Sequence, residues 1–279
     1  YIVSGESMAA QEIIGGGAVK LYVEETGNPN GRPILFIHGF SQSRLTWRQQ
    51  FNSELSNKFR LVALDLRGHG LSEKPHNAYG DSNLWASDIQ AVITTLGLER
   101  PILSGWSYGG AIISDYVRVY GDAQLGGIHF VGALTKLGDE LVPLLGKDFV
   151  ALVPGFFSND ASESSKALQK LVRLITYKEL PPSEFYYTLG YNTIVPPYVR
   201  SGLLSRSLSN NDLLPTFKAP VLITHGQLDE IVLLEAAKEH AELIPHAQLS
   251  IYPDVGHAPF WEDSKRFNQE LHDFVTNNS

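Results

Sequence analysis

Short apolar runs alternate with amphipathic stretches along most of this chain of 279 residues. Runs such as "ILFIHG" and "FRLVALD" are almost continuously apolar, as strands of a parallel sheet buried on both faces are. We expect strands over 18–25, 34–39, 59–65, 101–106, 126–134, 219–226 and 247–254, and helices over 82–97, 109–120, 233–243 and 259–276. This alternation predicts an α/β fold, a doubly wound and mostly parallel sheet with helices on both faces.

The alternation stops between residues 135 and 215, where the chain is rich in Leu, Phe, Tyr and Pro. We interpret 135–215 as a mostly helical cap inserted between two strands, and 8–134 with 216–279 as the core. Ligands of such sheets bind at the carboxyl ends of the strands, so an insertion there would cover the site. Residues 1–7 precede the only methionine, Met8, and we expect them to come from an expression vector.

The composition narrows the classes of function. The net charge of −8 lacks the basic footprint of a nucleic-acid binder, and without cysteine there can be no disulfide, thiolate metal site or cysteine nucleophile. No apolar run approaches a membrane span and no leader precedes the first strand, which favours a cytoplasmic location. The histidines do not pair at ligand spacing beside carboxylates, so we expect no metal and no cofactor. A small molecule is the expected partner, and the oligomeric state stays open.

A serine lies between two glycines at the junction of the strand 101–106 and the helix 109–120. Gly105-x-Ser107-x-Gly109 is the pattern of a nucleophile elbow, in which close packing of strand and helix leaves no room for side chains at the two glycines. A plain serine turn is the alternative. The strand before and the helix after favour the nucleophile.

A serine nucleophile needs a base, and the base needs an acid to orient it. Asp229 and His257 follow the strands 219–226 and 247–254, and the order Ser107, Asp229, His257 is the one expected for this topology. Glu230 and Asp254 are alternative acids. We expect His257 to move the proton and Asp229 to hold its imidazole in the correct tautomer.

Acyl transfer also needs N–H donors aimed at the developing oxyanion. We expect one from the backbone of Tyr108, the residue after the nucleophile. The other candidate is the backbone N–H of Phe40, in the loop after the strand 34–39. The assignment of Phe40 depends on the fold, because "HGF" by itself could simply end a strand.

Five segments together resemble the α/β-hydrolase family. "FIHGF", "DLRGHGLSEKP", "GWSYGG", "HGQLDEIV" and "DVGHAPFWE" occur in that order, and the similarity extends over about 18–277. The resemblance implies the fold of that family and a Ser-His-Asp triad. Within this family the chain is similar to small carboxylesterases, acyl-homoserine lactone hydrolases and cofactor-free haloperoxidases.

Departures from the subfamilies narrow the activity that the resemblance implies. Haloalkane dehalogenases and epoxide hydrolases carry aspartate where this chain has Ser107, and lipases often carry an HGGG loop that "HGFSQ" does not match. Haloperoxidases usually carry proline at the position of Ser41. We therefore expect a serine esterase for small to medium acyl chains. The alternatives are an acyl-homoserine lactone hydrolase, a perhydrolase, C–C hydrolase or cyanohydrin lyase with the same triad, or a receptor of this fold with no turnover.

The aromatic and aliphatic residues near the predicted site would give it an apolar lining, which suits an apolar acyl or aryl group. The acidic net charge of the chain does not attract anions, so a neutral ester is the better substrate. Many of the aromatic side chains could equally belong to the core. The substrate-binding residues that we predict are Trp106, Leu134, Phe156, Phe157, Tyr186, Tyr187 and Tyr191.

Overall fold

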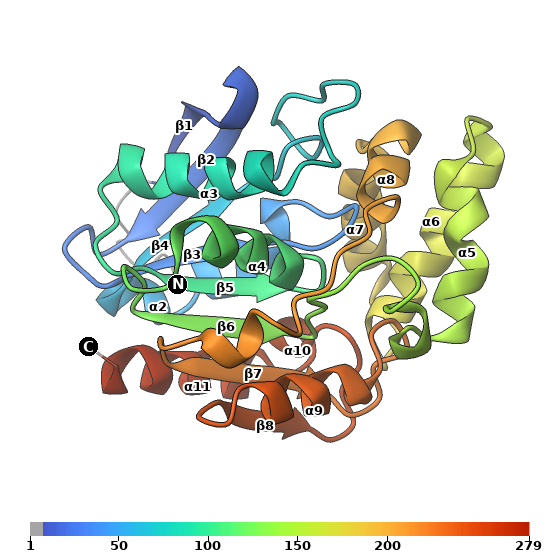
Figure 1. The fold of residues 1–279 in the computed structure, drawn as a ribbon. Helices are drawn as coiled ribbons and strands as arrows, with labels where there is room; N and C mark the ends of the chain where they lie inside the picture. The colour runs from blue at the N-terminus through green and yellow to red at the C-terminus, as the bar shows by residue number, and fades with distance from the viewer. Residues whose placement is uncertain (1–7, 279) are drawn as a thin grey trace.

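Figure 1 shows the computed structural model, which describes residues 8–278; the expectation for residues 1–7 lies outside the described residues. An eight-stranded sheet has the order β1-β2-β4-β3-β5-β6-β7-β8. The strands are β1 (Ala9–Ile14), β2 (Lys20–Gly27), β3 (Pro33–Ile37), β4 (Arg60–Leu64), β5 (Ile102–Trp106), β6 (Gly127–Val131), β7 (Val221–Gly226) and β8 (Gln248–Tyr252).

The predicted doubly wound, mostly parallel sheet is confirmed. Strands β3 to β8 pair in parallel, whereas β2 runs antiparallel to both β1 and β4. Every residue of β3, β5 and β6 is buried, as their continuous apolar sequences indicated. Strand β1 was not predicted, because nearly all of its residues are exposed at the sheet edge and it has no apolar face.

Helices cover both faces of the sheet. In β6 the His129 ring stacks on Phe267, with ring centroids 5.3 Å apart, and the next residue, Phe130, packs on His240 at 5.4 Å. Successive side chains of a strand point to opposite faces, so the helices that carry Phe267 and His240 lie on opposite sides. The helices of the core are α1 (Arg48–Phe51), α2 (Leu55–Lys58), α3 (Ser82–Leu96), α4 (Gly109–Tyr120), α9 (Leu234–Leu243), α10 (Pro259–Glu262) and α11 (Ser264–Asn277). Short 3₁₀ turns lie at Gly16–Ala18 and Arg44–Trp47, and between β6 and β7 at Val142–Leu144 and Leu214–Thr216.

The single helix predicted over 259–276 is two helices. Asp263 has non-helical backbone angles (φ −138°, ψ 61°) and separates α10 from α11. Its carboxylate accepts a hydrogen bond from the Arg266 N–H at 3.3 Å, so it serves as the N-cap of α11.

Four helices follow one another between β6 and β7, which confirms the predicted helical insertion. They are α5 (Lys147–Phe157), α6 (Ala161–Ile175), α7 (Pro182–Thr193) and α8 (Pro197–Leu204), and Figure 1 shows them beyond the carboxyl ends of the strands. Helix α6 begins where Asp160 accepts the Glu163 N–H at 2.8 Å. Helices α7 and α8 each begin with proline at the first helical position, where the missing N–H costs nothing.

Candidate active site

Ser107 sits in a strained turn between β5 and α4. Its φ of 55° lies in the left-handed region, which is uncommon for a residue with a side chain. The turn is held from both sides of the serine, since its N–H donates to the Val131 carbonyl at 2.9 Å and its carbonyl accepts from Gly110 (3.0 Å) and Leu134 (3.1 Å). A surrounding structure that fixes such a conformation is typical of functional positions.

The two glycines of the motif are required by close backbone approach. A Cβ placed on Gly109 would lie 2.6 Å from the Ile37 carbonyl oxygen, and one on Gly105 would lie 2.8 Å from the Gly109 carbonyl carbon. Both distances are shorter than any real Cβ contact with a backbone atom. The strand and the helix therefore meet as closely as the motif indicated.

His257 and Asp229 form a hydrogen-bonded pair. The His257 Nδ1 lies 2.6 Å from Asp229 Oδ2, and Asp229 Oδ1 accepts the N–H groups of Ile231 and Val232 at 2.8 and 2.9 Å. Burial raises the pKa of the Asp229 carboxyl, but the facing imidazoles of His257 and His225 outweigh it and hold that pKa well below its usual range. The ionised carboxylate can only accept, so Nδ1 carries a proton and Nε2 of a neutral His257 presents a lone pair.

The other two candidate acids do not contact this histidine. Glu230 and Asp254 are exposed, and neither hydrogen-bonds His257 within residues 8–278. Asp229 is 4% exposed and lies at the end of β7, where the sequence placed it.

The backbone of His257 is held by the inserted helices and by β5, the strand that precedes Ser107. Its N–H donates to the carbonyl of Ile175, the last residue of α6, at 2.9 Å. Its carbonyl accepts the indole N–H of Trp106 at 2.9 Å. The position of the His257 backbone, and with it the imidazole, therefore depends on the position of the C-terminal end of α6.

Glu262 makes a second connection between the same segments, and the sequence analysis did not identify it. Its carboxylate accepts the N–H of Gly256, next to His257, at 2.8 Å and the N–H of Tyr177, just after α6, at 2.7 Å. Burial raises the pKa of Glu262, while these backbone donors oppose the rise. "HAPFWE" contains the residue, but nothing in the sequence reveals its partner in the insertion.

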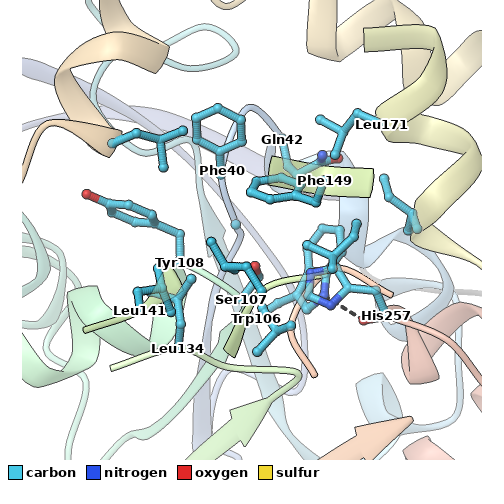
Figure 2. Close-up of a pocket in the computed structure, with 16 residues that line it drawn as sticks. Phe40, Gln42, Trp106, Ser107, Tyr108, Leu134, Leu141, Phe149, Leu171 and His257 are labelled. Atoms are coloured by element: carbon cyan, nitrogen blue, oxygen red, sulfur yellow. Dashed lines mark hydrogen bonds between the residues drawn. The ribbon is translucent and has the colours of Figure 1, made fainter. Parts of the chain in front are cut away.

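A narrow cavity of about 30 Å³ contains Ser107 and His257 in its wall (Figure 2). Within the described part of the chain the Ser107 hydroxyl makes no hydrogen bond to the His257 ring; such contacts are often loose before substrate binds. Most of the wall is apolar. The lining residues are Gly39, Phe40, Gln42, Trp106, Ser107, Tyr108, Leu134, Leu141, Leu145, Phe149, Leu171, Ile175, Leu204, Ile231, Val232 and His257.

Of the predicted substrate-binding residues, Trp106 and Leu134 line this cavity. The structure does not bring the others into its wall. Phe156 is fully buried and packs on Phe40, with ring centroids 5.4 Å apart. Tyr186 and Tyr187 are exposed on α7. The five residues outside the wall are Phe156, Phe157, Tyr186, Tyr187 and Tyr191.

Several lining residues were not anticipated, although some carried a signal. Ile231 and Val232 lie two and three residues after Asp229, so they reach the same end of the sheet. Leu171 and Ile175 are four residues apart on α6 and share one face of that helix. Gln42 carried no signal, because a polar residue in a loop is expected to face solvent.

Two backbone N–H groups, those of Phe40 and Tyr108, make no hydrogen bond to any acceptor in residues 8–278. The carbonyl of each peptide unit is held: Gly39 O accepts from His38 Nδ1 at 2.8 Å, and Ser107 O accepts from two N–H groups. Because a peptide unit is planar and trans, fixing the carbonyl also fixes the opposite N–H. Burial lowers the pKa of His38 to about 3, so its imidazole is neutral and donates through one nitrogen only.

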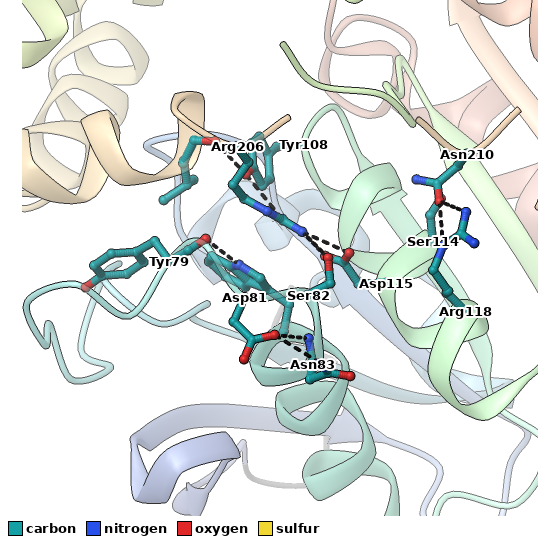
Figure 3. A network of polar contacts seen from close by, with 12 residues as sticks. Tyr79, Asp81, Ser82, Asn83, Tyr108, Ser114, Asp115, Arg118, Arg206 and Asn210 are labelled. Carbon is teal, nitrogen blue, oxygen red and sulfur yellow. Dashed lines mark hydrogen bonds and ion pairs between the residues drawn. The ribbon is translucent and has the colours of Figure 1, made fainter. Parts of the chain in front are cut away.

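The side chain of Tyr108 joins a buried polar network, shown in Figure 3. Its hydroxyl donates to the Leu203 carbonyl of α8 at 2.8 Å and lies 3.3 Å from Arg206 Nη1. Arg206 Nη2 is 2.8 Å from both carboxylate oxygens of Asp115 and 3.0 Å from Ser82 Oγ. This network connects the end of the insertion to α4, the helix that follows Ser107.

Two further features of the described residues bear on function. Within residues 8–278, no group of three or more His, Asp or Glu side chains is arranged to hold a metal ion. No helix in the described part combines the length and apolar character needed to cross a membrane.

Known proteins resemble this chain over nearly its whole length. A family model described as alpha/beta hydrolase fold matches residues 32–264. The crystal structure of the esterase RhEst1 from Rhodococcus sp. ECU1013 is 35% identical with a TM-score of 0.91, covering 97% of this chain and 99% of the other. An AB hydrolase superfamily protein, YisY of Bacillus subtilis, is 30% identical over 92% of this chain and 95% of its own. The bifunctional esterase/perhydrolase DCH of Acinetobacter calcoaceticus is 27% identical over 92% and 96%.

Proposed function

The chain belongs to the alpha/beta hydrolase fold family, and from that membership we propose that it is a serine hydrolase that cleaves carboxylic esters of small to medium acyl chains. One observation carries the proposal. Ser107, in a left-handed turn at the end of β5, and the hydrogen-bonded pair of His257 and Asp229 meet at one apolar cavity. A nucleophile, a base and an orienting acid are the groups that acyl transfer from an ester requires.

The proposed reaction uses these groups in order. His257 Nε2 takes the Ser107 proton while the serine oxygen attacks the ester carbonyl carbon, and the carbonyl oxygen becomes an oxyanion. The free N–H groups of Phe40 and Tyr108 are the proposed donors to that oxyanion. His257 then protonates the departing alcohol oxygen, leaving an acyl-serine. Water, deprotonated by the same imidazole, releases the acid and restores the serine.

Asp229 supports this cycle by staying ionised. When His257 gains a proton, the carboxylate 2.6 Å from its Nδ1 stabilises the imidazolium. The lowered pKa of Asp229 keeps that charge in place throughout the neutral pH range.

The size of the cavity favours small substrates. A volume of about 30 Å³ holds one or two waters, so a small acyl group fits it better than a long one. We propose residues 135–215 as the cap over this cavity and 8–134 with 216–279 as the core.

Peracid formation is a second candidate for the same site. It is favoured by the similarity to a bifunctional esterase/perhydrolase, while Ser41 stands where haloperoxidases usually carry proline. Hydrogen peroxide would replace water as the acceptor of the acyl group. An assay of acetate plus peroxide, run beside ester hydrolysis, separates the two activities.

The test of the proposal is the Ser107→Ala variant. We expect it to lose turnover of p-nitrophenyl acetate and butyrate by several orders of magnitude, because no other nucleophile is in place. Ser104→Ala is the matched control: Ser104 lies on the same strand, buried against His129, and its loss should leave turnover near wild type. A fluorophosphonate should label Ser107 in the wild type. Near wild-type turnover by Ser107→Ala would contradict the proposal.

A further inference from the structure

Gln42 places a carboxamide in the wall of the cavity (Figure 2). Among the described lining residues it is the one carboxamide, and apart from the nucleophile and the base its neighbours in the wall are mainly aliphatic and aromatic. The side chain is 3% exposed, so it has left bulk water. A buried amide needs hydrogen-bond partners, and those that it has can be counted.

The partners of Gln42 satisfy only half of its capacity. Its Nε2 donates to Asn192 Oδ1 at 3.3 Å, and its Oε1 accepts from Asn192 Nδ2 at 3.3 Å. Both bonds are longer than the usual range of about 2.7–3.2 Å. A carboxamide can donate two hydrogen bonds and accept two, so one N–H and one acceptor position of Gln42 stay unused within residues 8–278. We name this contact the amide pair.

Asn192 is held more firmly than Gln42. Its Nδ2 also donates to the Thr188 carbonyl of α7 at 2.9 Å, and Asn192 is itself fully buried outside the cavity wall. Asn192 therefore occupies one donor and one acceptor position of Gln42. The remaining N–H and the remaining acceptor position of Gln42 do not depend on Asn192, and Gln42 is the member of the pair that lines the cavity.

A purely hydrocarbon substrate chain would displace water from the cavity and leave these groups unpaired, which costs free energy. A chain with an uncharged oxygen would pair with them. An ionised group is disfavoured, because the described lining contains no lysine or arginine. We propose that Gln42 is a specificity-determining residue that selects esters whose chain inside the cavity carries a keto or hydroxyl oxygen. This assignment rests on the proposed ester hydrolysis at Ser107.

The experiment compares paired substrates in the full-length protein. For the acyl side the pair is p-nitrophenyl pentanoate and p-nitrophenyl 4-oxopentanoate; for the alcohol side it is pentyl acetate and 4-oxopentyl acetate, followed by acid release. The quantity is the ratio of kcat/KM for the keto ester to that for the plain ester. Differences in chemical reactivity cancel when this ratio is compared between wild type and variant.

We expect Gln42→Leu to lower the ratio for at least one pair by about fivefold to tenfold, the effect of one lost hydrogen bond. Gln42→Met, which has an unbranched side chain of similar length to glutamine, should give the same result and serves if Gln42→Leu fails to fold. Asn192→Ala is the matched control, since it breaks the amide pair but leaves the amide in the wall, and its ratios should not fall.

The outcomes separate the two proposals. If Ser107-dependent hydrolysis occurs but both ratios are unchanged in the Gln42 variants, the amide pair only ties α7 to the core and the specificity assignment is overturned. If Asn192→Ala lowers the ratios as much as the Gln42 variants do, it is overturned as well. If the wild type hydrolyses none of the esters through Ser107, the proposed function itself fails, and the assignment with it.

Discussion

Ser107 combines two demands that oppose each other. As the proposed nucleophile, its oxygen must stand clear of the sheet to reach a substrate. The turn that holds it there has a φ of 55°, which a residue with a Cβ adopts at a cost of about 1–3 kcal/mol. The glycines on either side reduce the crowding around it. The turn can form because Gly105 and Gly109, where a Cβ would collide with neighbouring atoms, have no side chain.

The Gly109→Ala variant tests this reading of the turn. Its Cβ would meet the Ile37 carbonyl oxygen at 2.6 Å, and a backbone atom cannot move aside as a side chain can. We expect the free energy of unfolding to fall by about 1–3 kcal/mol, measured in urea, and kcat for ester hydrolysis to fall with it.

Gly190→Ala is the control for this variant. Gly190 lies within α7, and nothing stands within 4 Å of its added Cβ. Alanine should raise stability there by up to about 1 kcal/mol, because it favours the helix. Equal effects of the two substitutions would contradict the close-packing account of the elbow.

The placement of Ser107, Asp229 and His257 at one end of the sheet could be predicted, because each follows a strand in a local motif. The amide pair and the Glu262 contacts could not be predicted. They join residues 150 and 85 positions apart, and no local pattern specifies which loop a buried carboxamide or carboxylate will face. The aromatic residues of the insertion were overestimated as ligand contacts, since apolar character alone does not distinguish core from cavity.

At the scale of elements, the insertion is attached to the core by a buried ion pair. Arg206 and Asp115 have side chains that are only 1% and 3% exposed. Burial raises the pKa of Asp115, although Arg206 opposes that rise. Removing either partner of a buried ion pair destabilises the fold, because the other charge stays buried without compensation.

We expect Arg206→Met to lower the free energy of unfolding by about 3–5 kcal/mol, because Asp115 would remain buried without its partner. The double variant Arg206→Met with Asp115→Leu should recover much of that loss, since it removes both charges. Urea unfolding of the two variants and the wild type measures the difference. A loss below about 1 kcal/mol in Arg206→Met would show that Asp115 is relieved by water or by Ser82 instead.

The strands of the core were predictable because burial on both faces makes their sequences continuously apolar. The inserted helices were harder, and only their existence was predicted. Pro182 and Pro197 mark the starts of α7 and α8, but a proline-rich apolar segment is also compatible with a loop. Contacts with the core, rather than local preference, decide these boundaries.

The whole molecule buries several neutral imidazoles. Burial lowers the pKa of each of four histidines to about 3: His38, His69, His129 and His240. In the unfolded chain a histidine has a pKa of about 6.5. Between these values the unfolded state binds more protons, so stability falls as the pH falls.

We expect the free energy of unfolding to decrease from about pH 6.5 downward, by at most roughly 5 kcal/mol per pH unit for four such groups. The lowered pKa of Asp229 acts in the same direction below its unfolded value, whereas the raised pKa values of Asp88, Asp115 and Glu262 oppose it. Urea unfolding at a series of pH values measures the slope. The slope of the unfolding free energy against pH gives the number of protons taken up on unfolding. In His240→Gln this number should be smaller by about one between pH 6 and 4. An unchanged slope would mean that His240 is already protonated in the folded protein.

The hydrogen bond from the His257 N–H to the Ile175 carbonyl couples the position of α6 to that of His257. While this bond is intact, the last residue of α6 helps to position the backbone of His257, the proposed general base. Any motion that lifts this end of α6 to admit a large molecule must break that bond. In the proposed reaction, a substrate that displaces this end of α6 would therefore also remove a hydrogen bond that positions His257.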